Sequence, residues 1–261
     1  MNNFLFWVPS VGLFFFAICA FLLVGHFWCK YKNQYVSEAA RSDMHIVETT
    51  IYAIMGLLIA FAFSGANTRL DQRRLLIIDE VNSVLATYYA LDILPPDMQA
   101  EAHQDLKQYV NDRLEWYRLY PNKASMNQQR QKYLQIQREL WNMAMQVCNK
   151  PGATQTCSLL PNALINMITI ENKKTLYKYL HPPTIVYEML LAIVLLGSLL
   201  AGYTVRGNFK EISVHMLLYA IILSLMIFII LNLEFPRAGS FSGSIFDNFN
   251  TGFVSLQAMM K

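Results

Sequence analysis

Long apolar stretches alternate with polar segments along this chain of 261 residues. A bilayer core about 30 Å thick needs roughly 20 apolar residues in a helix. Four stretches meet that length, and we predict membrane spans at about residues 4–28, 49–66, 184–205 and 214–233. The segment 67–183 between the second and third spans has ordinary polarity, so we expect it to lie outside the membrane.

The first span differs from a secretory signal peptide in three respects. It is too long, it has no basic segment in front of it, and no small-residue cleavage pattern follows it. We therefore expect it to remain as an anchor.

The second span differs from the others in its small residues. Its text TTIYAIMGLLIAFAFSGA includes Gly56, Gly65 and four alanines. Small residues mark faces where membrane helices approach each other, so we expect this span to be the interior helix of the assembly. The fourth span, the most apolar, is expected to face lipid, and the outer three are read as anchors.

The segment 67–183 shows helical periodicity and no alternating strand pattern. The second span should continue as one helix until Pro95–Pro96, with Pro96 as the first residue of the next helix. That next helix, to about Tyr120, should bury one face; its apolar positions are Met98, Ala102, Leu106, Val110, Leu114 and Tyr117. Two more helices are expected, from a Ser125 cap to about Val147 and from about Pro161 to Tyr179.

The predicted fold class is all-α. It has four transmembrane helices, with a helical extramembrane bundle inserted between the second and third. No linker is long enough to separate domains, so residues 1–261 are expected to form a single membrane-integrated domain.

The composition supports a membrane protein and excludes several other classes. Hydrophobic residues make up 54% of the chain and charged residues 15%, against about 25% in soluble domains. A net charge of +3 does not argue for nucleic acid, because topology and anionic lipid account for it. No catalytic motif or metal-ligand spacing occurs, so we expect no enzyme, no metal and no cofactor. The pair Asp79–Glu80 reads as a solvated face, and His181 as an interfacial residue.

Two of the four cysteines bear on the orientation in the membrane. A Cys148–Cys157 disulfide would close a short hairpin, and the sequence leaves open whether it forms. Seven lysines and arginines flank the spans on the side of the termini and of 67–183, against five on the other side. This excess favours cytoplasmic termini and a cytoplasmic 67–183 segment. The disulfide would require the reverse, because such bonds persist outside the cytosol.

The second span allows two interpretations. Ala53, Leu57 and Phe61 form a purely apolar helical face, and polar residues follow it at Asn67, Arg69, Asp71, Arg73 and Arg74. The simpler interpretation is bundle core capped by interfacial arginines. The functional interpretation is a pore helix, with an apolar neck that gates by dewetting and a charged vestibule beyond it. Four spans cannot enclose such a pore, so this interpretation requires a ring of identical subunits.

The run GLLIAFAFSGANTRLDQRRLLI resembles the second transmembrane helix of bacterial bestrophins. That helix is followed by N-x-x-x-x-R-x-x-x-A-R-x-L-W, and Arg69 and Arg74 fall on its two arginines. Counting back from Arg69, the family's pore-neck positions fall on Ala53, Leu57 and Phe61. The aromatic residue is retained at Phe61, whereas Ala53 is smaller than the usual isoleucine and implies a wider constriction.

Over residues 49–240 the chain resembles the bestrophin-like family of uncharacterised bacterial membrane proteins. The matching text is IIDEVNSVLATYYALDILP, LLPNALINMITIENKK, the HPP before the third span, and LEFPRAG. The resemblance implies a homopentameric ion channel of the bacterial inner membrane, with one axial pore lined by the second helix. The acidic calcium clasp of animal bestrophins is absent, so calcium gating is not implied, and charge selectivity does not follow either.

The partners expected on this interpretation are further copies of the chain, the lipid bilayer and a permeant ion. A non-conducting membrane-anchored scaffold or sensor, whose helical segment binds a partner, is the main alternative. A small-solute transporter is disfavoured, because the chain shows no internal repeat.

Overall fold

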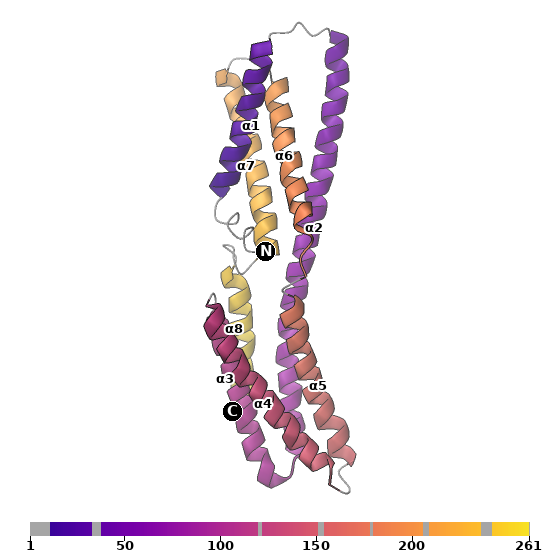
Figure 1. Ribbon diagram of the computed structural model, residues 1–261, viewed down its shortest axis with the longest axis vertical. Helices are drawn as coiled ribbons and strands as arrows, with labels where there is room; N and C mark the ends of the chain where they lie inside the picture. Colours follow the sequence, from indigo (N-terminus) through magenta and orange to yellow (C-terminus); the bar gives the residue numbers. More distant parts are fainter. Residues whose placement is uncertain are drawn as a thin grey trace. The chain divides into compact units, whose positions relative to one another are not determined.

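The computed structural model describes residues 11–32, 38–119, 122–150, 154–177, 180–205, 209–235 and 242–260. Within these residues every regular element is a helix, which confirms the all-α expectation. The elements are α1 (Val11–Lys32), α2 (Glu38–Ala90), the 3₁₀ turn η2 (Leu91–Ile93), α3 (Pro96–Arg118), α4 (Lys123–Cys148), α5 (Thr154–Tyr177), α6 (Thr184–Thr204), α7 (Phe209–Glu234) and α8 (Ser242–Met259) (Figure 1).

Residue contacts divide the chain into two compact units. The first unit comprises Met1–Leu70 and His181–Ser242, and the second comprises Asp71–Leu180 and Gly243–Lys261. Helix α2 contributes residues to both.

Four helices are long and apolar enough to cross a membrane, as predicted. They cover Val11–Tyr31, Met44–Ile93, Thr184–Thr204 and Ser213–Glu234. At 1.5 Å per residue the second of these is about 75 Å long, so only part of α2 crosses the bilayer. The expected residues 4–10 of the first span, and the LEFPRAG element from Pro236 onward, lie outside the described residues.

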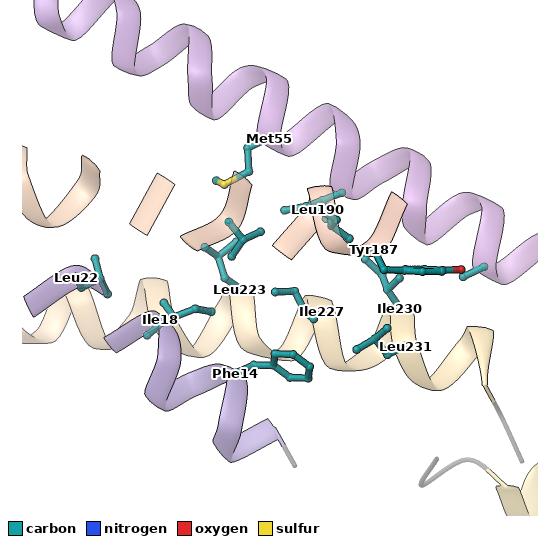
Figure 2. Close-up of a cluster of buried hydrophobic side chains, with 14 of the residues drawn as sticks. Phe14, Ile18, Leu22, Met55, Tyr187, Leu190, Leu223, Ile227, Ile230 and Leu231 are labelled. Carbon is teal, nitrogen blue, oxygen red and sulfur yellow. The ribbon is translucent and has the colours of Figure 1, made fainter. Parts of the chain in front are cut away.

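Helices α1, α6 and α7 form the apolar core of the first unit, with side chains from α2 reaching it. Figure 2 shows Phe14, Ile18 and Leu22 of α1 beside Leu223 and Ile227 of α7. All five side chains are buried. Helices α1, α6 and α7 thus each bury one face within the first unit.

The closest helix approach in the first unit joins α1 and α6 through glycines. A Cβ on Gly25 would collide with the backbone carbonyl of Leu199, and a Cβ on Gly202 with the backbone carbonyl of Leu22. Both glycines are buried. Small residues that let two backbones touch are typical of packed membrane helices.

Two of the expectations about the spans concern neighbours outside the single chain, and they stay predictions. The second span, expected to be the interior helix of the assembly, is the least buried within the single chain, with 17% of its apolar window buried. A Cβ on Gly56 would meet no atom within 4 Å. The fourth span, expected to face lipid, has the most buried window, at 39%. The reason is that α7 packs on α1 and also contacts α6, whereas α2 reaches the core through few side chains.

The second unit packs α3, α4, α5, α8 and the last part of α2. The expected start at Pro96 is confirmed, with Pro95 as N-cap. Five of the six predicted apolar positions on α3 are buried, Met98 being the half-buried one. Helix α4 begins before the expected cap, because the Asn122 side chain accepts a 3.2 Å hydrogen bond from the backbone N–H of Ser125.

The expected start of α5 at Pro161 is wrong. The helix begins at Thr154 and carries Pro161 inside it. A proline there lacks the N–H that would bond to the carbonyl four residues earlier. Burial of Leu160, Leu164 and Met167 on one face offsets that loss.

Helix α8 was not predicted from the sequence. It packs in the second unit, where Gln257 Nε2 donates a 2.6 Å hydrogen bond to Asn111 Oδ1 of α3. Tyr88 of α2 donates a 3.3 Å bond to the backbone carbonyl of Met260. Phe253 and Leu256 are fully buried.

Candidate functional site

The predicted pore-neck residues lie on the exposed face of α2 in the first unit. Leu57 and Phe61 are 55% and 66% exposed, and Ala53 is exposed with them. The opposite face of the helix turns Met55 and Ile59 into the core, as Figure 2 shows for Met55. The structure therefore brings the three predicted residues together on one surface that no other part of the described chain covers.

A partly buried ion pair holds α2 at the end of this face. Arg69 donates to Glu234 Oε2 through both Nε and Nη2, each at 2.7 Å. Glu234 is fully buried at the end of α7. Its other oxygen lies 2.7 Å from Nδ1 of His181, which lies just before α6. One carboxylate thus joins three chain segments.

A second buried carboxylate holds α2 at the other end of the face. Glu48 Oε1 accepts hydrogen bonds from the hydroxyls of Tyr52 at 3.0 Å and of Thr204 at 2.7 Å. Tyr52 also lies 3.5 Å from the carbonyl of Gly197 on α6. Glu48 of α2 accepts a bond from Thr204 of α6, and Arg69 of α2 pairs with Glu234 of α7, so the two carboxylates attach α2 to the other helices of the first unit.

The predicted vestibule residues do not share one surface. Arg69 is committed to Glu234 and does not lie on the exposed face. Asn67 and Asp71 are exposed, and Arg73 is half-buried. Arg74 lies 3.5 Å from Asp71, and both side chains are about half exposed. An exposed pair of this kind contributes about 0–1 kcal/mol, so it leaves Arg74 available to other partners.

The second unit contains a buried charge cluster that the sequence analysis missed. Glu80, expected on a solvated face, is fully buried, whereas its neighbour Asp79 is exposed. Arg113 of α3 donates to Glu80 Oε1, through Nε at 2.7 Å and through Nη2, and Lys174 of α5 donates to Glu80 Oε2. The cluster therefore ties α2, α3 and α5 together.

Aromatic residues and a second carboxylate complete this cluster. Tyr133 donates a 3.0 Å hydrogen bond to Glu171, and the Arg113 guanidinium lies 4.7 Å from the Tyr133 ring centroid. Burial alone would lower the pKa of Arg113, but Glu80 and the nearby tyrosines raise that pKa well above its usual value. Burial raises the pKa of Tyr133. Arg113 and Tyr133 therefore both stay protonated.

A disulfide joins Cys148 at the end of α4 to Cys157 in α5. The Cα atoms are 5.1 Å apart, within the range that a disulfide spans. The predicted residues Cys148 and Cys157 are thus brought together, while Cys19 and Cys29 are free thiols.

The spacing of residues along α2 could have predicted the burial of Glu80. Glu80 follows Ile77 by three positions and precedes Val84 by four, so it shares their buried face. No local signal connects it to Arg113, which is distant in sequence. Likewise, the sequence around Glu234 predicts only that this charged residue ends a span. The fold brings Arg69 beside it.

Comparison with protein-family models, with curated proteins and with solved structures finds no match to this chain. The class that the fold defines is therefore a helical membrane protein with four candidate spans, and any finer function rests on its geometry.

Proposed function

We propose that the protein is a homo-oligomeric ion channel of the bestrophin-like type, with a pore lined by α2. The observation that carries this proposal is the exposure of one face of α2. Its apolar window is the least buried of the four, at 17% against 22–39% for the others. Two buried carboxylates, Glu48 and Glu234, hold the helix so that Ala53, Leu57 and Phe61 point away from the chain's own core.

An apolar face of this kind suits the neck of a pore. A narrow ring of apolar side chains empties of water when closed and conducts when it widens, which is gating by dewetting. One chain cannot surround a pore, so several copies must close a ring around one axis. The resemblance noted above favours five copies in a bacterial inner membrane.

The disulfide supports an orientation opposite to the one that the count of lysines and arginines favours. Disulfides persist outside the cytosol, and the charge difference of seven against five is small. We infer that the second unit lies on the extracytoplasmic side. In a background with Cys19 and Cys29 changed to Ser, a membrane-impermeant thiol reagent should label a Ser125→Cys variant in whole cells. Labelling only after lysis would show that the second unit lies in the cytoplasm.

Planar-bilayer recording of the purified protein tests the channel proposal. Phe61→Ala should widen the neck and raise the open probability, because it removes the largest exposed side chain of the face. Phe16→Ala on α1 is the matched control, since Phe16 is similarly exposed, at 71%, but lies on another helix. Silent bilayers over a range of ions and pH, with a monomer in detergent, would overturn the proposal. Currents unchanged by Phe61→Ala would mean that another helix lines the pore.

A cavity in the second unit favours the alternative of a membrane-anchored sensor. It has a volume of about 530 Å³ and a polar lining that includes Asp112, Arg118, Gln129, Lys132 and Gln257. Its mixed charges suit a small zwitterion. If the protein is a sensor, added amino acids should raise its melting temperature, and Lys132→Ala should abolish that rise. Such a result, together with silent bilayers, would support the sensor over the channel.

A further inference from the structure

In the second unit, α2 exposes a stripe of side chains that no described part of the chain covers. Leu75, Ile78 and Tyr89 are 57%, 54% and 59% exposed, with Asn82 exposed and Leu85 half-buried between them. Successive members are three and four residues apart, so all five lie along one side of the helix. We call these five residues the α2 seam.

The surroundings of the α2 seam indicate water rather than lipid. The same stretch of helix carries Gln72, Asp79 and Asn82 on its exposed surface. Its other side buries Glu80 against Arg113 and Lys174 in a polar bundle. Apolar side chains more than half exposed to water, aligned over four turns, are typical of a surface that another protein covers.

The spacing indicates what kind of partner covers the seam. Alternating steps of three and four residues are the heptad pattern by which helices pack against helices of the same pattern. In heptad notation, Leu75, Asn82 and Tyr89 occupy the a positions, and Ile78 and Leu85 occupy the d positions. Glu80 then falls at an f position, which is the position farthest from the partner helix. This agrees with its burial inside the second unit of its own chain.

Charge complementarity selects a second copy of this chain in parallel orientation. Arg74 lies at a g position and Asp79 at the e position of the next heptad, five residues later. In a parallel pair of helices those two positions meet across the interface. The contact of Arg74 with Asp71 inside the chain is exposed and weak, so it can be exchanged for Asp79 of a second copy. Parallel orientation is also the one that copies with the same topology in one membrane adopt.

Asn82 adds a further sign of parallel register. A polar residue at a single a position meets its equivalent when parallel helices are in register, and it disfavours shifted alignments. Asn82 is the only polar member of the α2 seam. We propose that the α2 seam is the surface through which copies of the chain associate outside the membrane, in parallel and in register. This inference rests on the proposed homo-oligomer and names the contact that assembles it.

Disulfide trapping in native membranes tests the seam. In a background with Cys19 and Cys29 changed to Ser, Asn82→Cys should form a disulfide-linked dimer on mild oxidation, because equivalent a positions approach closely. Gln104→Cys, on the exposed surface of α3, is the matched control and should stay monomeric. Equal trapping of both variants, or no trapping at Asn82, would overturn the inference.

A charge reversal provides a second measurement. Arg74→Asp should lower the yield of the Asn82→Cys dimer several-fold, because it places two acids opposite each other. Adding Asp79→Arg should restore the yield. Yields unchanged by either variant would overturn the parallel register.

Trapping, oligomeric mass and bilayer recording together distinguish a failure of the seam inference from a failure of the channel proposal. An oligomer by mass that does not trap at Asn82 rejects the seam and leaves the channel proposal standing. Trapping at Asn82 with silent bilayers keeps the seam and rejects the channel.

Discussion

Nε of Arg113 donates a 2.7 Å hydrogen bond to Oε1 of Glu80, and both side chains are buried between α3 and α2. A buried ion pair of this kind is costly to break from one side, because the remaining charge loses its partner but stays out of water.

The first prediction follows from that asymmetry. Glu80→Gln should lower the stability of the second unit by about 3–5 kcal/mol, because it leaves the Arg113 guanidinium without its carboxylate. Glu101→Gln, at an exposed position of α3, should change stability by less than about 0.5 kcal/mol. Thermal unfolding of the purified protein in detergent measures both. Equal melting temperatures for the two variants would contradict the buried pair.

The second prediction concerns the pair in the first unit. Arg69→Gln should destabilise the protein by about 1–3 kcal/mol, because the fully buried Glu234 loses both of its hydrogen bonds from arginine. Arg118→Gln is the control, since its pair with Glu115 is about half exposed and should contribute under about 1 kcal/mol. Melting temperatures in detergent compare the two variants, and a larger loss for Arg118→Gln would contradict the role of Arg69.

The third prediction concerns the approach of α1 to α6. Gly25→Ala or Gly202→Ala should cost about 1–3 kcal/mol, because the added methyl group meets a backbone carbonyl that cannot move freely. Gly56→Ala should be neutral or slightly stabilising, since its site is open and alanine favours a helix. If all three variants melt alike, the two helices do not touch at these glycines.

The fourth prediction concerns the disulfide. The denatured, unreduced protein should bind two thiol labels, and the reduced protein four, since Cys148 and Cys157 are joined and Cys19 and Cys29 are free. Cys148→Ser should lower stability by about 2–3 kcal/mol, from the entropy of the short loop that the bond closes. Cys29→Ser provides the control. Four labels without reduction would contradict the bond.

The fifth prediction is a pH dependence at Asp105. Burial, followed by the charges of Glu139 and Glu101, raises the pKa of this carboxyl group above its usual value. A carboxyl with a raised folded-state pKa favours the protonated form, so its ionisation destabilises the fold as the pH rises through that pKa. Asp105→Asn should therefore stabilise the protein at pH 7. The gain should vanish below the pKa of the unfolded chain, about 3.9, as melting curves at both pH values would show.

The sequence predicted those parts of the fold that local chemistry determines. Hydropathy located the four apolar helices, and Pro95–Pro96 located the start of α3. The start of α5 was missed because proline in a first turn is the commoner case. Here the bond from Cys148 and the burial of Leu160 hold a helix that begins before Pro161.

The site was less predictable, because its contacts join distant positions. Periodicity placed Ala53, Leu57 and Phe61 on one face, and they do lie together on an exposed surface. Periodicity could not show that Arg69 turns to Glu234, since their separation of 165 residues carries no local pattern. The rotation of one helix relative to another depends on such long-range pairs, so it cannot be predicted from the local sequence.

Helix α8 determines the order in which the second unit can be built. The hydroxyl of Tyr88 and the amide of Asn111 find their partners in Met260 and Gln257, which the ribosome adds only after α6 and α7. During synthesis, the second unit must therefore wait for both later spans before its last helix can dock. Until then the surface that buries Phe253 and Leu256 stays uncovered, so the second unit is completed only after both later apolar helices have been synthesised.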